Sequence, residues 1–206
     1  MALTDTACYY RSARMLSKMS RVLGLDDPYL ARSEEIRAAL LRNFVDADTG
    51  EVAGACQTSD GCVAFHHLLK PQEEARLMER LAERIAQNGW HIDYGILGSK
   101  YVLNMLGEYG RTDVIYKMLT REDYPGYLYW VDHGCTTLAE CWNLGGSHNH
   151  YMFSDVSAVF YRYFAGIRPD GDIPAYRSFL LAPALDLAID TLSCLSLIHI
   201  SEPTRR

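Results

Sequence analysis

The sequence lacks the features that mark membrane-spanning and nucleic-acid-binding proteins. No apolar run approaches the roughly 20 residues that a helix needs to cross a bilayer. Lysine and arginine number 20 against 26 aspartates and glutamates, so the formal net charge is −6, and no basic patch stands out along the sequence. Nucleic acid and anionic membrane are therefore poor candidates as partners.

Paired cysteines are also missing. The six cysteines are scattered, no C-x-x-C pair occurs, and free thiols are the simpler expectation than a disulfide or zinc framework. Residues 1–20 have no apolar signal core and are typical of an amphipathic helix. No cofactor or metal is expected, and both a cytoplasmic and a secreted location stay open.

Helical periodicity dominates what is present. Hydrophobic residues make up 49% of the chain and charged residues 22%, which is a globular composition. The expected helices cover about 4–23, 28–44, 61–69, 71–88, 97–108, 112–119 and 154–165. Residues 127–131 alternate weakly and are interpreted as a short strand, and residues 179–187 indicate the start of a stranded unit. The predicted fold class is all-α.

The same periodicity predicts which side of each helix is buried. In the helix of 71–88 the leucines and isoleucine form an apolar stripe, and the charged side chains, Glu74 included, are expected to face solvent. The first helix is expected to bury one apolar face, and four helical tyrosines are interpreted as core. The predicted buried face of the first helix consists of Tyr9, Ala13, Leu16, Met19 and Leu23. The four tyrosines interpreted as core are Tyr9, Tyr10, Tyr161 and Tyr163.

The connections between the helices alternate between short and long. The long ones, at 51–60, 90–95 and 124–150, carry most of the aromatic, histidine and acidic residues outside the helices. This pattern suits helical hairpins arranged in a ring with the functional loops at one end. It also suits a helical solenoid, although no strict sequence repeat supports one.

The segment 134–153 (GCTTLAECWNLGGSHNHYMF) concentrates side chains that suit a pocket-lining loop. Glu140 is the only carboxylate between Asp132 and Asp155, so it is the natural candidate for chemistry. Asn149 and His150 offer amide and ring groups that can bond sugar hydroxyls. The alternative, that Glu140 is only a structural hydrogen-bond acceptor, stays open.

Other chemistries fit this segment less well. A metal site could be built from histidine and cysteine, but the spacing fits no known zinc pattern. Nucleophilic catalysis by Cys135 or Cys141 lacks an obvious oriented base. The acidic balance argues against a nuclease role for the His-Asn-His triplet. The residues considered for a metal are His133, Cys135, His148, His150 and the pair His66–His67.

Several motifs together resemble the catalytic domain of bacterial alpha-L-rhamnosidases, glycoside hydrolase family 78. The similar pieces follow the family order and extend over about residues 3–190. Each piece is weak alone, and together they are specific. They are 93–98 (DYGILG), 106–116 (LGEYGRTDVIY), Tyr124-Pro125, 134–142 (GCTTLAECW), 147–153 (SHNHYMF) and 164–167 (FAGI).

The resemblance implies a partial (α/α)6 barrel of the six-hairpin glycosidase type over residues 1–168, followed over 169–192 by the start of a C-terminal β-sandwich. It implies hydrolysis, with inversion, of terminal α-L-rhamnosyl groups from rhamnose-containing glycosides or polysaccharides. A non-catalytic helical carbohydrate-binding or scaffold domain is the alternative, and the oligomeric state stays open.

The matching motifs also assign roles. Glu140 falls on the family's general base, and His150 falls on a histidine that contacts the sugar. The other residues expected to bind substrate are Asn149, Trp142, Trp130 and Asp93. Two positions depart from the family, which often has tryptophan where Ala139 and Tyr127 stand here, so the surface that stacks on the sugar is not defined by the motif.

The family's general acid lies upstream of the part that this chain matches, so it is expected to precede Met1. Asp60, Asp93 and Asp132 have no motif that would support them in that role. Residues 193–206 resemble translated sequencing adaptor and are not expected to contribute to the fold. The chain is thus expected to be an incomplete, inactive fragment that exposes apolar surface.

Overall fold

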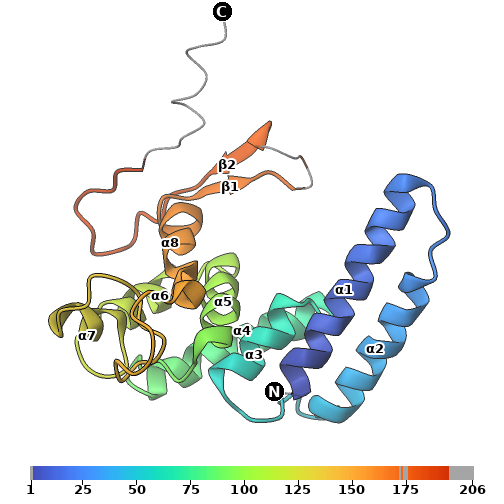
Figure 1. The fold of residues 1–206 in the computed structure, drawn as a ribbon, viewed down its shortest axis with the longest axis horizontal. Coiled ribbons are helices and arrows are strands. Elements are labelled where there is room, and N and C mark those ends of the chain that lie inside the picture. Colours follow the sequence, from blue (N-terminus) through green and yellow to red (C-terminus); the bar gives the residue numbers. More distant parts are fainter. Residues whose placement is uncertain (1, 172, 174–175, 195–206) are drawn as a thin grey trace, which may run out of the picture.

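The structure is a computed structural model that describes residues 2–171, 173 and 176–194. Most of this chain is helical (Figure 1), which confirms the predicted class. The helices are α1 (Ala2–Leu23), α2 (Tyr29–Phe44), α3 (Gln57–Phe65), α4 (Pro71–Gln87), α5 (Ile96–Glu108), α6 (Thr112–Leu119), α7 (Tyr127–Asp132) and α8 (Asp155–Val159). A 3₁₀ turn, Tyr151–Phe153, precedes α8, and a π-helical turn, Phe160–Phe164, extends it.

A small antiparallel sheet follows the helices. Strand β1 (Ile167–Pro169) pairs with β2 (Phe179–Leu181), and Ile167 lies opposite Leu181. The sheet stands at the end of the α8 segment, away from α4 and α7 (Figure 1). The predicted stranded unit is therefore present as one two-stranded ribbon, and its continuation into a β-sandwich stays a prediction.

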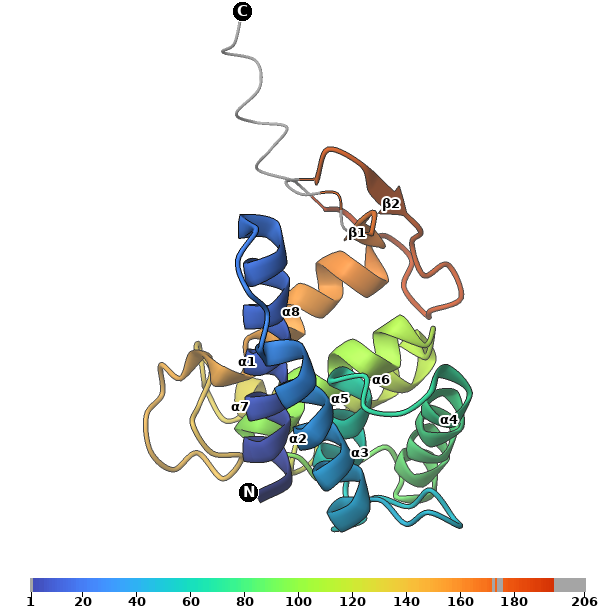
Figure 2. The ribbon, with the colours of Figure 1, turned by 90° about the vertical axis from the view of Figure 1, so that its right-hand side faces the viewer.

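The helices pack as successive hairpins. Helix α1 packs on α2, α3 on α4, and α5 on α6, while α1, α3, α5 and α8 contact one another in that order. Helices α1 and α2 lie side by side at one edge of the helical array (Figure 1), and Figure 2 shows them from that edge, in front of the other helices. Helix α5 is buried on nearly all sides, as expected for the element at the centre of the row.

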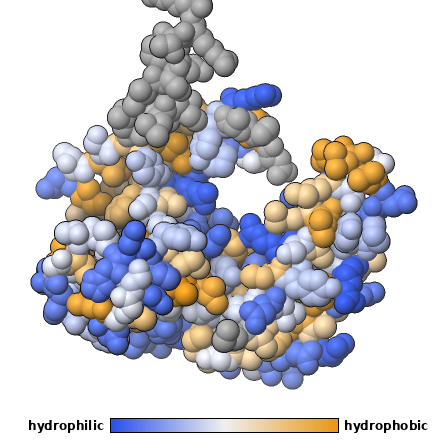
Figure 3. Space-filling view, viewed as in Figure 1, coloured by the Kyte–Doolittle hydropathy of each residue, from blue (hydrophilic) through white to orange (hydrophobic). Residues whose placement is uncertain are grey.

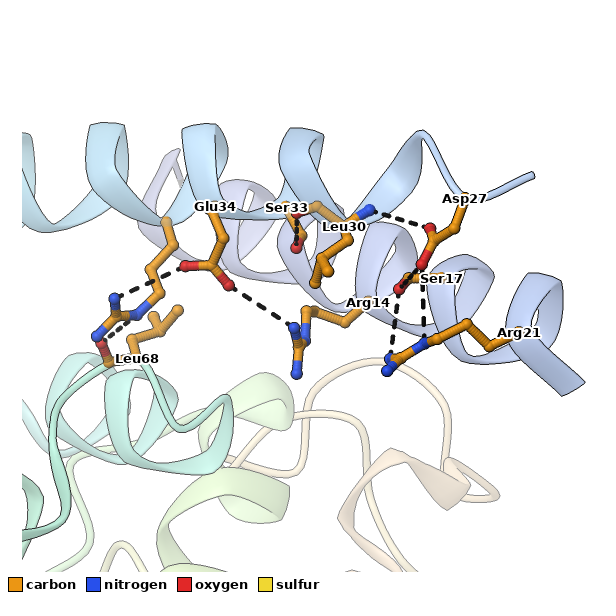
Figure 4. A network of polar contacts seen from close by, with 9 residues as sticks. Arg14, Ser17, Arg21, Asp27, Leu30, Ser33, Glu34 and Leu68 are labelled. Atoms are coloured by element: carbon orange, nitrogen blue, oxygen red, sulfur yellow. Dashed lines mark hydrogen bonds and ion pairs between the residues drawn. The ribbon is translucent and has the colours of Figure 1, made fainter. Parts of the chain in front are cut away.

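The α1–α2 hairpin is fastened by polar contacts near its turn (Figure 4). Ser17 donates to the Asp27 carboxylate at 2.7 Å, and the same carboxylate accepts from the backbone N–H of Leu30 at 3.2 Å. Arg14 reaches Glu34 across the hairpin at 3.7 Å. Because these groups are partly exposed, they fix the register of the two helices more than they stabilise the fold.

Two element assignments from the sequence were wrong. Helix α3 begins at Gln57 rather than Gly61, because the distant Asp93 carboxylate accepts the Gln57 backbone N–H at 3.1 Å. Residues 127–132 form helix α7 instead of a strand. Tyr127 and Trp130 lie three positions apart, so a helix turns both rings toward the same aromatic cluster.

The buried faces also differ from the prediction at several positions. Helix α1 turns a stripe of mostly small residues inward, from Leu3 through Ala7 and Ala13 to Ser20, so the face predicted to be buried points largely to solvent. Tyr9 and Tyr161 are about half exposed, whereas Tyr10 and Tyr163 are buried as expected. Each error placed an apolar stripe one position away from the side that the neighbouring helices cover.

Glu74 was expected in solvent and is buried instead. Its Oε1 accepts from the Tyr109 hydroxyl at 2.8 Å and lies 3.1 Å from His67 Nδ1. Position 74 precedes the stripe of Leu77, Met78 and Leu81 by one helical turn, so it shares their inward face. The two partners replace the hydrogen bonds that water would have made.

Exposed apolar side chains gather toward the free end of the α1–α2 hairpin, which is coloured orange in Figure 3. Their exposed fractions run from 44% to 86%. They are Met15, Leu16, Met19, Val22, Leu23 and Leu25. A contiguous apolar surface of this kind favours association.

We expect the isolated chain to self-associate through this surface. Sedimentation velocity should give a concentration-dependent mass, and the double variant Met19→Lys, Leu23→Lys should shift the distribution toward monomer. Both positions point to solvent, so the lysines should leave the fold intact. A monodisperse, cooperatively melting monomer of the unsubstituted chain would contradict this prediction.

Two buried ionisable groups in α3 and just after it affect stability in opposite directions. Asp60 lies 2.5 Å from Arg84, yet burial outweighs that attraction and raises the pKa of its carboxyl to about 6. His66 is buried with both ring nitrogens unpaired among the described residues, and burial lowers its pKa to about 4. The unperturbed pKa values are 3.8 for an aspartate carboxyl and 6.5 for a histidine imidazole.

The two groups predict opposite pH profiles. The stabilising contribution of protonated Asp60 is present below about pH 4 and is lost as pH rises through about 6. The stabilising contribution of neutral His66 is present above about pH 6.5 and is lost as pH falls through about 4. Urea unfolding should therefore show Asp60→Asn gaining stability relative to the unsubstituted chain as pH rises, and His66→Phe gaining it as pH falls, each by about 1–3 kcal/mol. Parallel profiles for all three proteins would refute the assignment.

None of the helices in the described part of the chain is long and apolar enough to cross a membrane.

The segment expected to derive from adaptor sequence lies, from residue 195 onward, outside the described residues.

Candidate active site

The loop between α7 and the 3₁₀ turn doubles back on itself. The His150 N–H donates to the Leu138 carbonyl at 2.8 Å, and the Glu140 N–H donates to the Ser147 carbonyl at 2.8 Å. The Thr137 hydroxyl donates to the His148 carbonyl. These bonds hold the two arms of the loop, 137–140 and 147–150, antiparallel to each other. Glu140 and His150 thus stand on facing arms, and their side chains approach each other.

The Glu140 carboxylate is held on one side and free on the other. Its Oε2 accepts the Ser147 backbone N–H at 3.0 Å and lies 3.9 Å from His150 Nδ1. The side chain is 43% exposed, and Oε1 has no hydrogen-bond partner within the described residues. A carboxylate fixed in this way keeps Oε1 available to accept a proton from a water molecule.

His150 supplies a second polar group beside it. Its ring is mostly buried, with 26% of the side chain exposed, and Nε2 has no hydrogen-bond partner among the described residues. Asn149 is exposed, and its backbone N–H is taken by the Ser147 hydroxyl at 3.2 Å. The exposed Asn149 side chain therefore remains able to bond an added ligand, whereas His150 Nε2 is buried and the Nδ1 side of the ring faces Glu140.

Trp142 of the loop packs against Trp130 of α7. Trp142 stacks on Trp130 with ring centroids 4.5 Å apart, and Tyr127 and Phe153 meet both rings at steep angles. The Trp130 indole donates to the Trp142 carbonyl at 3.0 Å, and the Trp142 indole donates to the Tyr94 carbonyl at 2.7 Å. Trp130 is only 2% exposed, so its contribution is to support the loop, whereas Trp142 keeps a partly open face.

Asp93 stands apart from the Glu140–His150 pair. Both of its carboxylate oxygens accept the Gln57 N–H at the start of α3, at 3.1 and 3.3 Å. Desolvation raises the pKa of this carboxyl. Its neighbour Tyr94 contacts the loop, because the Trp142 indole donates to the Tyr94 carbonyl.

Two residues that were not predicted from the sequence, Ser147 and Gly146, set the position of Glu140. Ser147 provides the backbone N–H that orients the carboxylate. Gly146 has a φ of +78°, and a Cβ atom there would lie 2.6 Å from Glu140 Oε2. The Gly145–Gly146 pair was the visible signal, because glycine pairs mark backbone that a side chain would obstruct.

Gly146→Ala should therefore displace the Glu140 carboxylate. We expect kcat of the longer, active protein to fall by about 10–100-fold, since a misplaced catalytic group of this kind costs up to roughly 10²-fold. Gly134→Ala is the matched control, because Gly134 has a φ of +81° but nothing within 4 Å of the added Cβ. Equal activities of the two variants would show that backbone strain alone, not the contact with Glu140, causes the effect.

The rival metal site is not assembled in the described part of the chain, where no group of three or more metal-ligating side chains comes together. His133 Nδ1 lies 2.8 Å from the Tyr129 carbonyl and His148 Nε2 lies 2.9 Å from the Leu144 carbonyl. Each ring thus uses one nitrogen to hold its own backbone.

The main clefts of the described residues lie elsewhere. One of them, of about 660 Å³, lies between the end of α2, the turn at 46–50 and α4. Glu140 lines neither this cleft nor the next three. Glu140 thus stands on an open loop surface, and the described residues alone do not enclose a sugar around it.

Comparison with known proteins gives one consistent result. The chain is 27% identical over 89% of its length to an alpha-L-rhamnosidase of Alteromonas sp. (strain LOR), and 31% identical over 86% to one of Streptomyces avermitilis. It covers 21% and 18% of those two proteins, so it spans about a fifth of their length.

The fold agrees with the same relationship. The crystal structure of Streptomyces avermitilis alpha-L-rhamnosidase complexed with L-rhamnose superposes with a TM-score of 0.78 at 30% identity, over 87% of this chain and 18% of that one. Residues 1–164 match the bacterial alpha-L-rhamnosidase six-hairpin glycosidase domain. This chain therefore belongs to the family of bacterial alpha-L-rhamnosidase six-hairpin glycosidase domains and forms part of one such domain.

Proposed function

We propose that this chain supplies the general base of an inverting glycoside hydrolase that removes terminal α-L-rhamnosyl groups from glycosides or polysaccharides. The observation that carries the proposal is the Glu140 carboxylate, which Ser147 orients through Oε2 while Oε1 stays free for water. Because the chain spans about a fifth of its relatives, the activity is proposed for the longer protein that contains this segment.

The chemistry requires a second carboxyl. In an inverting glycosidase, the base activates a water molecule on one face of the sugar while an acid about 6.5–9.5 Å away protonates the leaving oxygen. The Asp60 carboxylate is buried beside Arg84, and the Asp93 carboxylate accepts the Gln57 backbone N–H at the start of α3. Neither group is therefore free to protonate the leaving oxygen. Asp132 is exposed but carries no matching motif. We assign the acid to a part of the longer protein outside this chain.

His150 and Asn149 are proposed to bind the sugar. The exposed Asn149 amide can bond a ring hydroxyl of rhamnose, and the His150 ring can do so through Nδ1, which has no hydrogen bond within the described residues. The partly open face of Trp142 offers apolar surface for the C–H side of the sugar. Trp130 and Asp93 contribute by holding the loop and the start of α3 in place.

A substrate screen tests the proposal. The longer protein should hydrolyse an aryl α-L-rhamnoside and leave aryl glucosides, galactosides and fucosides largely intact. Cleavage of another glycoside in place of the rhamnoside would retain the hydrolase and reject the sugar. No turnover of any glycoside, combined with rhamnoside binding in calorimetry, would favour the carbohydrate-binding alternative.

A further inference from the structure

One of the clefts away from Glu140, of about 430 Å³, lies between α1 on one side and the C-terminal ends of α3 and α5 on the other. The surface in Figure 3 is hollowed between the α1–α2 hairpin and the rest of the molecule, the two parts that border this cleft. Four of its lining side chains are basic: Arg11, Arg14, Lys18 and Arg162. Only one carboxylate, that of Glu108, lines it among the described residues.

This concentration of positive charge runs against the net charge of −6 of the chain. Arg14 is partly neutralised by Glu34, at 3.7 Å. Arg162 donates to the Asn104 amide oxygen at 3.2 Å, and the Arg11 guanidinium lies 4.8 Å from the centre of the Phe65 ring. Lys18 has no ion pair within the described residues. Three of the four cations therefore face the cleft without a carboxylate partner, although like charges placed together repel one another.

A buried histidine lies at the floor of the same cleft. His66 is 6% exposed, and neither of its ring nitrogens has a hydrogen-bond partner in the described part of the chain. Phe65 and Tyr101 pack edge-on against its ring and offer no acceptor at these contacts. An imidazole always carries at least one N–H donor, and buried donors are normally paired. Both ring nitrogens are themselves buried, so the described residues leave this donor beside the cleft without an acceptor.

The cleft is separate from the candidate active site. It lies at the C-terminal ends of α3 and α5, at residues 65–67 and 108. Glu140 belongs to a loop that contacts Tyr94, just before the N-terminus of α5. The two sites therefore occupy opposite ends of the same helices.

We propose that this basic cleft binds an oxyanion group, a carboxylate, sulfate or phosphate. Guanidinium groups match the paired oxygens of such anions, and a neutral sugar would leave the cations without counter-charge. The group is carried either by a free ligand or by an acidic side chain of the longer protein. The two sources share one chemistry and are separated by experiment.

Calorimetric titration of the chain with sodium sulfate, at constant ionic strength set by sodium chloride, tests the proposal. We expect saturable binding that Arg11→Gln and Lys18→Gln each weaken by about 5–10-fold. Both side chains are exposed on α1, so neither substitution disturbs the core. Arg42→Gln is the matched control, because it removes the same charge from the cleft between α2 and α4 and should bind sulfate normally.

The longer protein then identifies the source of the anion. Sulfate binding that persists there indicates a free ligand, whereas binding that disappears while Arg11→Gln lowers the melting temperature indicates an internal carboxylate. Absence of saturable sulfate binding to the chain, or equal weakening by Arg42→Gln, would overturn the proposal. Both results are independent of rhamnoside hydrolysis.

Discussion

Glu140→Gln should lower kcat of the longer protein by about 10²–10⁴-fold, the range that general-base assistance contributes. Glutamine retains the size of the side chain and can still accept the Ser147 N–H, which lies 3.0 Å from the carboxylate. It cannot accept a proton from water. Because the base acts in the transition state, KM should change much less than kcat.

Steady-state kinetics on an aryl α-L-rhamnoside measures this effect. Glu122→Gln is the matched control, since Glu122 is an exposed glutamate on another loop and its replacement should leave kcat unchanged. If Glu140→Gln turns over at a near-normal rate, Glu140 is a structural acceptor and the base lies elsewhere. A rise in KM at constant kcat would instead assign Glu140 to substrate binding alone.

Trp130→Ala should destabilise the chain by about 3–5 kcal/mol, the usual cost of truncating a buried aromatic side chain. Trp130 is 2% exposed, stacks on Trp142 and contacts Tyr127 and Phe153. Its removal leaves a cavity beneath the loop and ends the indole hydrogen bond to the Trp142 carbonyl. The loss should therefore affect both global stability and the order of the Glu140 loop.

Urea unfolding, at a protein concentration below that of self-association, measures the first effect. Trp90→Ala is the comparison, because Trp90 is only partly buried and has Lys117 over its ring at 4.1 Å. It should cost clearly less than Trp130→Ala. A loss below about 1 kcal/mol for Trp130→Ala would mean that the aromatic cluster does not hold the loop.

The sequence predicted the helices whose signals are local. Helix α4 starts at Pro71 and has charged residues opposite an apolar stripe, so its start was assigned correctly and its end, at Gln87, to within one residue. Helix α3 was misplaced because the carboxylate at its N-terminus comes from Asp93, far along the chain. Helix α7 was misread because its six residues are too few to display a period.

The candidate site was predictable in part for the same reason. The resemblance placed Glu140 and His150 in one loop, and the structure brings them within 3.9 Å. It could not give the bond from the Ser147 N–H or the space that Gly146 leaves, because both depend on how the loop doubles back. Trp130 was assigned to the sugar-binding surface because burial cannot be read from residue type alone.

The most direct test of the account is to follow the first anomer released from an aryl α-L-rhamnoside by proton NMR, with the longer protein and its Glu140→Gln variant side by side. We expect β-L-rhamnose from the unsubstituted protein, before mutarotation, and almost no release from the variant. Initial release of α-L-rhamnose, or β-L-rhamnose from both proteins at similar rates, would contradict the role of Glu140 as an inverting base.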